Sequence, residues 1–188
     1  MGKEGFEQIM GLQAAPMLTG LKAASLLSFH KSKFRDFAGL LAVYEPCFKC
    51  KGISIFKVSE GEDYVLLLFY RAGALWRDLN RAKAKEILVQ CGYRIEDTLQ
   101  EKLDFLRMRM QIRKSFPHEI GLFLGYPAED VAGFISHKGQ DFCYSGYWKV
   151  YVNERETRAL FDLYADCTKE FCDRLEHGAD LVDLVQAV

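Results

Sequence analysis

The run Tyr64–Arg71 (YVLLLFYR) constrains the fold more than any other part of this sequence. It is apolar over most of its length and rich in residues that favour strands, which is typical of a central strand buried on both faces. A second β-rich run, ISIFKV at residues 53–58, precedes it across a polar linker that contains a glycine. The two runs therefore predict a β-hairpin with a longer loop.

Periodicity and turn residues predict the other elements. Residues 21–29 fit either a buried strand or a short helix, whereas residues 120–124 and 142–152 are typical of strands. We expect helices to stop at Pro16 and Pro46, because a proline disfavours helical backbone at the residue before it. The predicted helices cover residues 8–18 with an end before Pro16, 32–44, 75–91, 95–114, 128–137, 154–177 and a short tail at 181–188.

This order of elements indicates an α+β (mixed α/β) protein. The helices come first, a hairpin and a helix pair follow, and the chain ends in a strand-helix-strand-helix series. No repeat, low-complexity tract or linker divides the chain, so we expect a single layered domain over residues 1–188. Its sheet should be mixed, with about four to five strands, and covered by helices.

Charge and hydropathy exclude several classes of protein. Lys and Arg number 25 against 26 Asp and Glu, and the net charge of −1 makes nucleic-acid binding an unfavoured function. No apolar run reaches the roughly 18 to 20 residues that span a membrane. The first ten residues lack the features of a secretory signal, so we expect a cytoplasmic protein with reduced cysteines.

The segment FPHEIGLFLGYPAEDVAGFI, residues 116–135, is the richest in candidate site residues. Histidine side chains are suited to proton transfer near neutral pH, so His118 could act as a general acid or base, with Glu119 and Tyr126 as ligand-binding neighbours. Gly125 and Tyr126 would form a loop that leads into a helix, a place where ligands often bind. The alternative for this loop is a structural turn, because Glu129 and Asp130 in the first turn of the helix stabilise its dipole but repel an anion. The alternative for His118 is a backbone hydrogen bond, since consecutive strand residues such as His118 and Glu119 point to opposite faces.

The strand predicted at residues 144–151 (YSGYWKVY) offers a second half of a pocket. Alternation places Ser145, Tyr147, Lys149 and Tyr151 on one face. Tyr147, Lys149 and Tyr151 could form a platform for a flat or anionic ligand, because aromatic faces stack and lysine supplies charge. The alternative is a half-buried strand with its tyrosine hydroxyls in water.

The six cysteines support a different hypothesis. Cys143, Cys167 and Cys172 are the candidate ligands of a metal, although Cys167 and Cys172 lie about 140° apart around a helix. Cys47 and Cys50 have C-x-x-C spacing, but a helix precedes them where thioredoxin-like chemistry needs a strand. The signatures of P-loop, dinucleotide-binding, zinc-protease and α/β-hydrolase sites are missing from the sequence.

The chain resembles the bacterial family called Domain of Unknown Function 3793. The resemblance rests on APMLTGLKAASLLSF, on FPHEIGLFLGYPAEDVAGFI, on SGYWKVY, and on the helix that contains Tyr164, Cys167 and Cys172. The resemblance implies no activity. Members of the family come mainly from anaerobic bacteria, and this association alone favours thiol, iron or flavin chemistry. The family is associated with a cysteine just before the proline that is Pro16 here, but this chain has Ala14 and Ala15 at that place. The hypothesis of a metal site that uses this cysteine is therefore weakened.

Three functions remain open from the sequence. The first is a small-molecule-binding domain or an enzyme, in which His118 is the acid or base, Lys149 holds an anionic group, and Tyr126 or Tyr147 orients the substrate. The second is a thiol-based metal, haem or redox-partner protein. The third is an adaptor that binds a protein partner through exposed aromatic residues or the apolar tail. The sequence identifies no cofactor and no particular ligand or partner.

Overall fold

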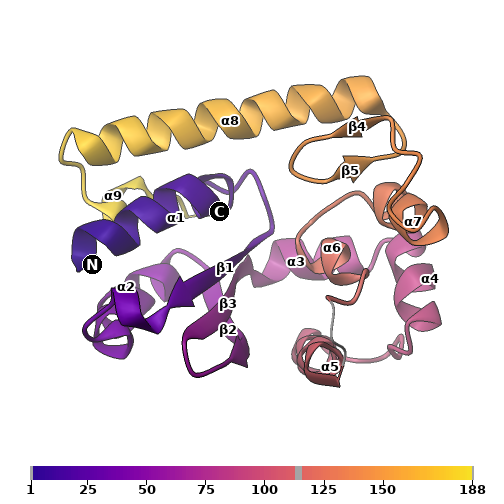
Figure 1. The fold of residues 1–188 in the computed structure, drawn as a ribbon, viewed down its shortest axis with the longest axis horizontal. Coiled ribbons are helices and arrows are strands. Elements are labelled where there is room, and N and C mark those ends of the chain that lie inside the picture. Colours follow the sequence, from indigo (N-terminus) through magenta and orange to yellow (C-terminus); the bar gives the residue numbers. More distant parts are fainter. Residues whose placement is uncertain (1, 113–115, 188) are drawn as a thin grey trace. The chain divides into compact units, whose positions relative to one another are not determined.

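The computed structural model describes residues 2–112 and 116–187, which form two compact units (Figure 1). One unit comprises Met1–Ala72 and Tyr164–Val188, and the other comprises Gly73–Leu163. The first is therefore built from both ends of the chain, and the second from one continuous stretch. A single domain over residues 1–188 stays a prediction.

The first unit contains a three-stranded antiparallel sheet. Its strands are β1 (Ala24–His30), β2 (Ile53–Glu60) and β3 (Tyr64–Arg71), in the order β1-β3-β2. The central position of β3 and the β2–β3 hairpin were both predicted, and every residue of β3 after Tyr64 is buried. The ambiguous segment at residues 21–29 contributes strand β1 rather than a helix.

Helices cover the sheet face that carries Phe29 and Phe69. They are α1 (Lys3–Leu18), α2 (Phe37–Cys50) and α9 (Leu181–Leu184), and a short 3-10 turn, η1 (Lys31–Lys33), follows β1. Phe6 of α1 stacks on Phe29 with ring centroids 5.6 Å apart, and Phe48 of α2 meets Phe69 edge to face at 5.8 Å. These buried aromatic pairs form the core of the unit.

The predicted helix ends at Pro16 and Pro46 are wrong, because α1 and α2 each continue through their proline. A proline removes one helical hydrogen bond, but Pro16 lies in the last turn of α1, where few such bonds follow it. Pro46 lies between Tyr44 and Phe48, and the continued helix buries both of these rings in the core. Helix α2 begins at Phe37 rather than residue 32, since the carboxylate of Asp36 accepts a 2.8 Å hydrogen bond from Gly39 N.

The side chain of Arg71 joins the end of β3 to three other segments of this unit. Its guanidinium donates hydrogen bonds to the carbonyls of Met17, Leu18, Lys51 and Gln186, at 2.7 to 3.0 Å. Met17 and Leu18 lie at the end of α1, and Lys51 follows α2, so the cation faces helix C-termini whose carbonyls lack helical partners. These carbonyls solvate the buried charge of Arg71, and the bond to Gln186 fixes the C-terminal tail.

The second unit is mainly helical. It contains α4 (Ala82–Gln90), α5 (Leu99–Ile112), α6 (Ile120–Phe123) and α7 (Ala128–Ser136), together with nearly all of α3 (Ala72–Leu79) and the first part of α8 (Glu154–Glu176). The helix predicted at residues 75–91 is divided into α3 and α4, and Gly92 ends α4 with a φ of +96°, as expected. Residues 113 and 114 of the helix predicted at 95–114 lie outside the described residues.

Two predicted strands are wrong, and with them the single mixed sheet. Residues 120–124 form the short helix α6, and residues 142–152 form a hairpin of β4 (Tyr144–Ser145) and β5 (Lys149–Val150). A short apolar run does not distinguish a strand from a buried helix, and here the amide of Ile120 bonds to the Pro117 carbonyl to start a turn. The described residues therefore contain two antiparallel sheets, of three and two strands.

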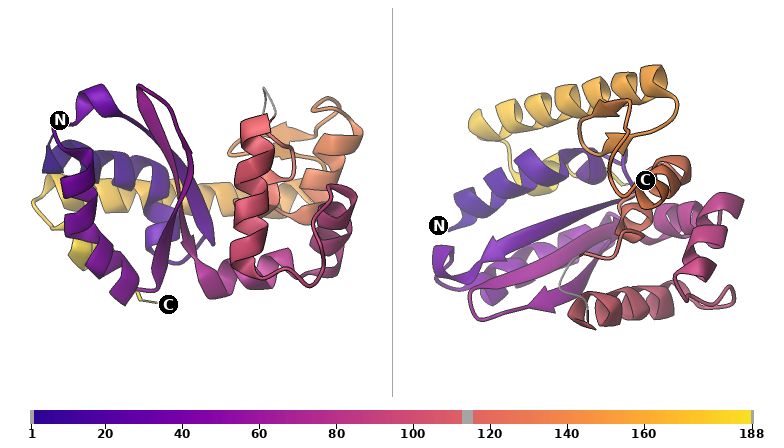
Figure 2. Two further views of the ribbon diagram at one scale, coloured as in Figure 1. Left: turned by 90° about the horizontal axis from the view of Figure 1, so that it is seen from below. Right: turned by 45° about the vertical axis from the view of Figure 1, so that its right-hand side comes forward.

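Helix α8 is the longest element, and its first turns pack beside the β4–β5 hairpin (Figure 2). Gly178, with a φ of +88°, follows the helix end at the place predicted from the sequence. Among residues 2–112 and 116–187, no helix combines the length and the apolar character needed to cross a membrane.

Candidate ligand-binding pocket

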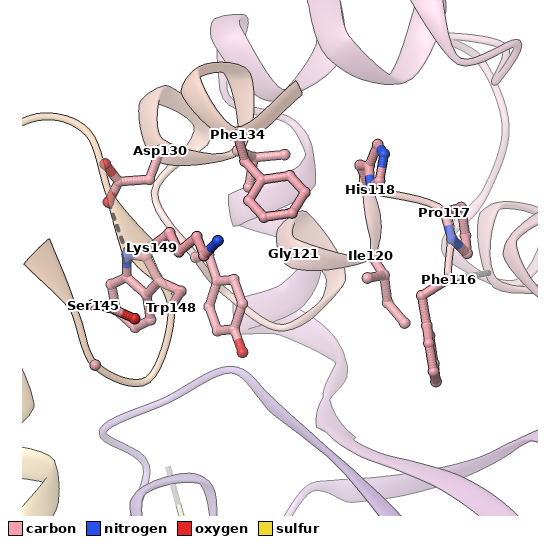
Figure 3. A pocket seen from close by; sticks show the side chains of 13 residues that line it. Phe116, Pro117, His118, Ile120, Gly121, Asp130, Phe134, Ser145, Trp148 and Lys149 are labelled. Carbon is pink, nitrogen blue, oxygen red and sulfur yellow. Dashed lines mark hydrogen bonds between the residues drawn. The ribbon is translucent and has the colours of Figure 1, made fainter. Parts of the chain in front are cut away.

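A cavity of about 370 Å³ opens within the second unit (Figure 3). Its walls come from the loop before α6, from α6 and α7, and from the β4–β5 hairpin. The lining residues are mostly apolar or aromatic: Phe116, Pro117, His118, Ile120, Gly121, Tyr126, Asp130, Val131, Phe134, Ser145, Gly146, Trp148 and Lys149.

Aromatic rings form much of the lining. Tyr126 stacks on Trp148 with centroids 4.7 Å apart and an interplanar angle of 26°. The edge of Trp148 in turn meets the ring of Phe161 on α8 at 4.5 Å. Burial raises the pKa of Tyr126, so its hydroxyl stays protonated and neutral at physiological pH.

Asp130 fixes the hairpin to α7. Its carboxylate is 2% exposed and accepts three hydrogen bonds, from the Trp148 indole at 2.8 Å and from the backbone amides of Tyr151 and Val152 at 2.8 and 3.1 Å. Figure 3 shows the carboxylate turned toward Trp148. The charge of Asp130 is therefore used to hold the pocket wall in place.

Lys149 brings a positive charge to the cavity. Its ammonium donates a 2.6 Å hydrogen bond to the carbonyl of Gly139 and lies 4.7 Å from the Phe142 ring centroid and 5.9 Å from that of Phe134. Figure 3 shows the ammonium close to the Phe134 ring, toward the middle of the group of lining side chains. The contact with two rings is a cation–π arrangement, which stabilises the amine without neutralising it.

His118 lines the same cavity, but Glu119 does not. The imidazole of His118 packs against Phe134 with centroids 5.1 Å apart, and it has no hydrogen-bond partner among residues 2–112 and 116–187. Glu119 is 1% exposed and accepts from Arg109 Nε and, at 3.5 Å, from the Tyr93 hydroxyl. The pair therefore does not act as an acid–carboxylate dyad, and Glu119 anchors the pocket loop to α5.

The structure brings together half of the residues predicted for this pocket. His118, Tyr126 and Lys149 line it, whereas Glu119, Tyr147 and Tyr151 lie outside its lining. The platform of Tyr147, Lys149 and Tyr151 rested on a continuous strand, but residues 146–148 form the hairpin turn. Tyr147 packs on Phe161 at 5.3 Å, and Tyr151 stacks on His137 at 5.6 Å.

Sequence reasoning missed three residues that build the pocket. Phe134 gives no signal in the sequence beyond an apolar residue in a predicted helix, and alternation along residues 144–151 places Trp148 on the face opposite Lys149. Asp130 appeared only as an acid that favours a helix start. One signal was present in the sequence, because a tryptophan that is buried needs a hydrogen-bond acceptor for its indole N–H, and Asp130 was a nearby acid.

The cysteines do not assemble a metal site in the described part of the chain. There, no three His, Cys, Asp or Glu side chains are grouped so that they could hold a metal ion. Cys143 donates to the Tyr151 carbonyl at 3.5 Å, and the sulfur of Cys167 lies 3.2 Å from the Thr19 hydroxyl. Burial raises the pKa of the Cys172 thiol, which disfavours the thiolate that metals bind. The metal, haem or redox hypothesis gains no support.

These features define an α+β protein with a small aromatic cavity in its second unit. The chain belongs to the family described as a protein of unknown function, DUF3793, which matches residues 10–185. The resemblance found in the sequence is thereby confirmed over nearly the whole chain. No curated protein and no solved structure matches it.

Proposed function

We propose that this protein binds a small organic molecule in the cavity between α6, α7 and the β4–β5 hairpin. The observation that carries the proposal is the cavity itself, whose aromatic walls enclose about 370 Å³ and include only a few polar side chains. Ligand sites typically measure roughly 300 to 1,000 Å³ and combine apolar walls with a few convergent polar groups. This cavity therefore fits a small ligand.

The polar groups favour binding over catalysis. An orienting partner is a common mark of a general acid or base, and residues 2–112 and 116–187 provide no such hydrogen-bond partner for the His118 ring. Asp130 is occupied by three hydrogen bonds to the hairpin. An enzymatic role for His118 would require the substrate to orient the imidazole, so we place binding first.

The two tryptophans allow a direct test by NMR. Trp148 lines the cavity, whereas Trp76 lies on α3 and does not, and Trp76→Phe assigns the two indole N–H signals. We expect hits from a library of small aromatic and heteroaromatic fragments to shift the Trp148 signal and leave the Trp76 signal in place. A screen in which no fragment shifts Trp148 selectively would overturn the proposal.

Two variants check the location of binding. Phe134→Ala removes a wall of the cavity and should weaken the hits severalfold. Ile95→Ala removes an exposed apolar side chain outside the lining and should leave their affinities unchanged. Equal effects of the two variants would contradict binding at this site.

A further inference from the structure

We infer that the ligand is a planar aromatic molecule with a single negative charge, of the carboxylate type, and that Lys149 binds the anionic group. The inference rests on the proposed function, because it names the ligand class of the same cavity. The first observation is the small number of charged residues in the lining. Lys149 and Asp130 are the only Lys, Arg, Asp or Glu residues among the described residues that line it, and the Asp130 carboxylate faces the hairpin.

The ammonium of Lys149 has more N–H donors than the described residues have acceptors for it. A lysine carries three N–H donors, and the described residues provide one acceptor, the Gly139 carbonyl. The Phe134 and Phe142 rings limit its access to water on two sides. A partly desolvated ammonium with unused donors binds an anion more strongly than a neutral group, because charge-assisted hydrogen bonds are stronger than neutral ones.

The bond to Gly139 also prepares Lys149 for binding. Gly139, with a φ of +76°, belongs to a tight turn in which Lys138 and Asp141 also have left-handed backbone, at φ values of 52° and 56°. The turn presents the Gly139 carbonyl to the ammonium at 2.6 Å and so fixes a side chain that would otherwise sample many rotamers. A side chain that is fixed beforehand loses less entropy when it binds a ligand.

The residues that line the cavity favour a flat ligand with one negative charge. Phosphate sites usually combine several cations or a bare helix N-terminus, but no arginine is among the described lining residues, and the first turn of α7 carries Glu129 and Asp130. A dianion in the cavity would share the lining with Asp130 and have one lysine to balance it. Phe134, Tyr126 and Trp148 present rings, which favour a ligand that stacks.

Three naphthalene compounds of similar size test the charge of the ligand. 2-Naphthoate carries one negative charge, 2-naphthamide carries none, and 2-naphthyl phosphate carries up to two. We expect calorimetric titration to show 2-naphthoate binding about tenfold or more tightly than 2-naphthamide, and no less tightly than the phosphate. Lys149→Met should remove the preference for 2-naphthoate and leave 2-naphthamide binding within about twofold.

Matched variants separate charge from folding. Lys149→Arg keeps the charge and should retain a preference for 2-naphthoate, and Lys169→Met removes an exposed lysine outside the lining and should have no effect. Equal affinities for 2-naphthoate and 2-naphthamide, or an unchanged preference in Lys149→Met, would overturn the inference. A Trp148 shift with 2-naphthamide would still support the proposed function. If none of the three compounds shifts Trp148, the inference is wrong, and the fragment screen decides the proposed function separately.

Discussion

The indole of Trp148 donates a 2.8 Å hydrogen bond to Oδ2 of Asp130, and this bond links the hairpin to helix α7. The other carboxylate oxygen of Asp130 accepts from the amides of Tyr151 and Val152. The position of the hairpin, which forms one wall of the cavity, therefore depends on the Asp130 carboxylate.

Asp130→Asn should destabilise the protein by about 2–4 kcal/mol, because the amide places an N–H group against donors that need an acceptor. Urea unfolding followed by circular dichroism measures the loss. Glu129→Gln changes the exposed acid next to it on α7 and should shift stability by less than about 0.5 kcal/mol. Similar losses in the two variants would contradict the role assigned to Asp130.

A double substitution isolates the bond between Asp130 and Trp148. Trp148→Phe removes the indole donor, so part of the cost of Asp130→Asn should disappear in that background. We expect a coupling free energy of about 1 kcal/mol or more between the two positions. Strictly additive losses would show that the hydrogen bond contributes little.

Arg71→Lys should destabilise the first unit by about 2 kcal/mol or more. Lysine cannot reproduce the planar fork by which Arg71 reaches four carbonyls, so most of these buried hydrogen bonds are lost. Thermal unfolding of the purified variant measures the effect. Arg35→Lys, at an exposed position, serves as the control. A similar loss of stability in Arg35→Lys would contradict the stabilising role of the Arg71 hydrogen bonds.

Gly133→Ala tests how closely the hairpin approaches α7. Alanine normally stabilises a helix interior relative to glycine by about 1 kcal/mol, but a Cβ at position 133 would overlap the Tyr151 ring and lie 2.6 Å from its Cβ. We therefore expect a net loss of about 1–3 kcal/mol. Gly73→Ala on α3 meets no atom within 4 Å and should be neutral or stabilising, as measured by urea unfolding.

Glu60 should retain its negative charge to unusually low pH. Lys31 and Lys57 lie 2.8 and 2.7 Å from its two carboxylate oxygens, and the hydrogen bonds to these lysines lower the pKa of Glu60 from 4.5 to about 2. The interaction stabilises the fold above pH 4.5 and is lost as the pH falls toward 2. A carbon-13 NMR titration of the side-chain carboxyl checks this, and a midpoint near 4.5 would contradict it. Lys31→Met with Lys57→Met should restore the ordinary value.

The sequence predicted the elements whose signals are local. The run Tyr64–Arg71 became the central strand because its residues are apolar on both faces, and Gly92 and Gly178 follow helix ends because they adopt positive φ. The predictions were wrong where tertiary packing determines the secondary structure. Ile120–Phe123 is helical and Pro46 lies within a helix, although neither is apparent from periodicity.

The candidate site divides in the same way. His118, Tyr126 and Lys149 line the cavity, and their side-chain chemistry is visible in the sequence. Glu119 was misplaced because its partner Arg109 comes from another helix, and the pairing of Asp130 with Trp148 spans 18 residues. Contacts of this kind depend on how the helices pack, which the spacing of residues does not encode.

The bond from Arg71 to the carbonyl of Gln186 bears on how this protein is made. The chain leaves the ribosome N-terminus first, so the three-stranded sheet emerges before the residues from Tyr164 onward that complete its unit. The stretch Gly73–Leu163 is synthesised whole in the interval. The second unit can therefore fold before the first is complete, and the guanidinium of Arg71 gains its fourth carbonyl only after Gln186 has been synthesised.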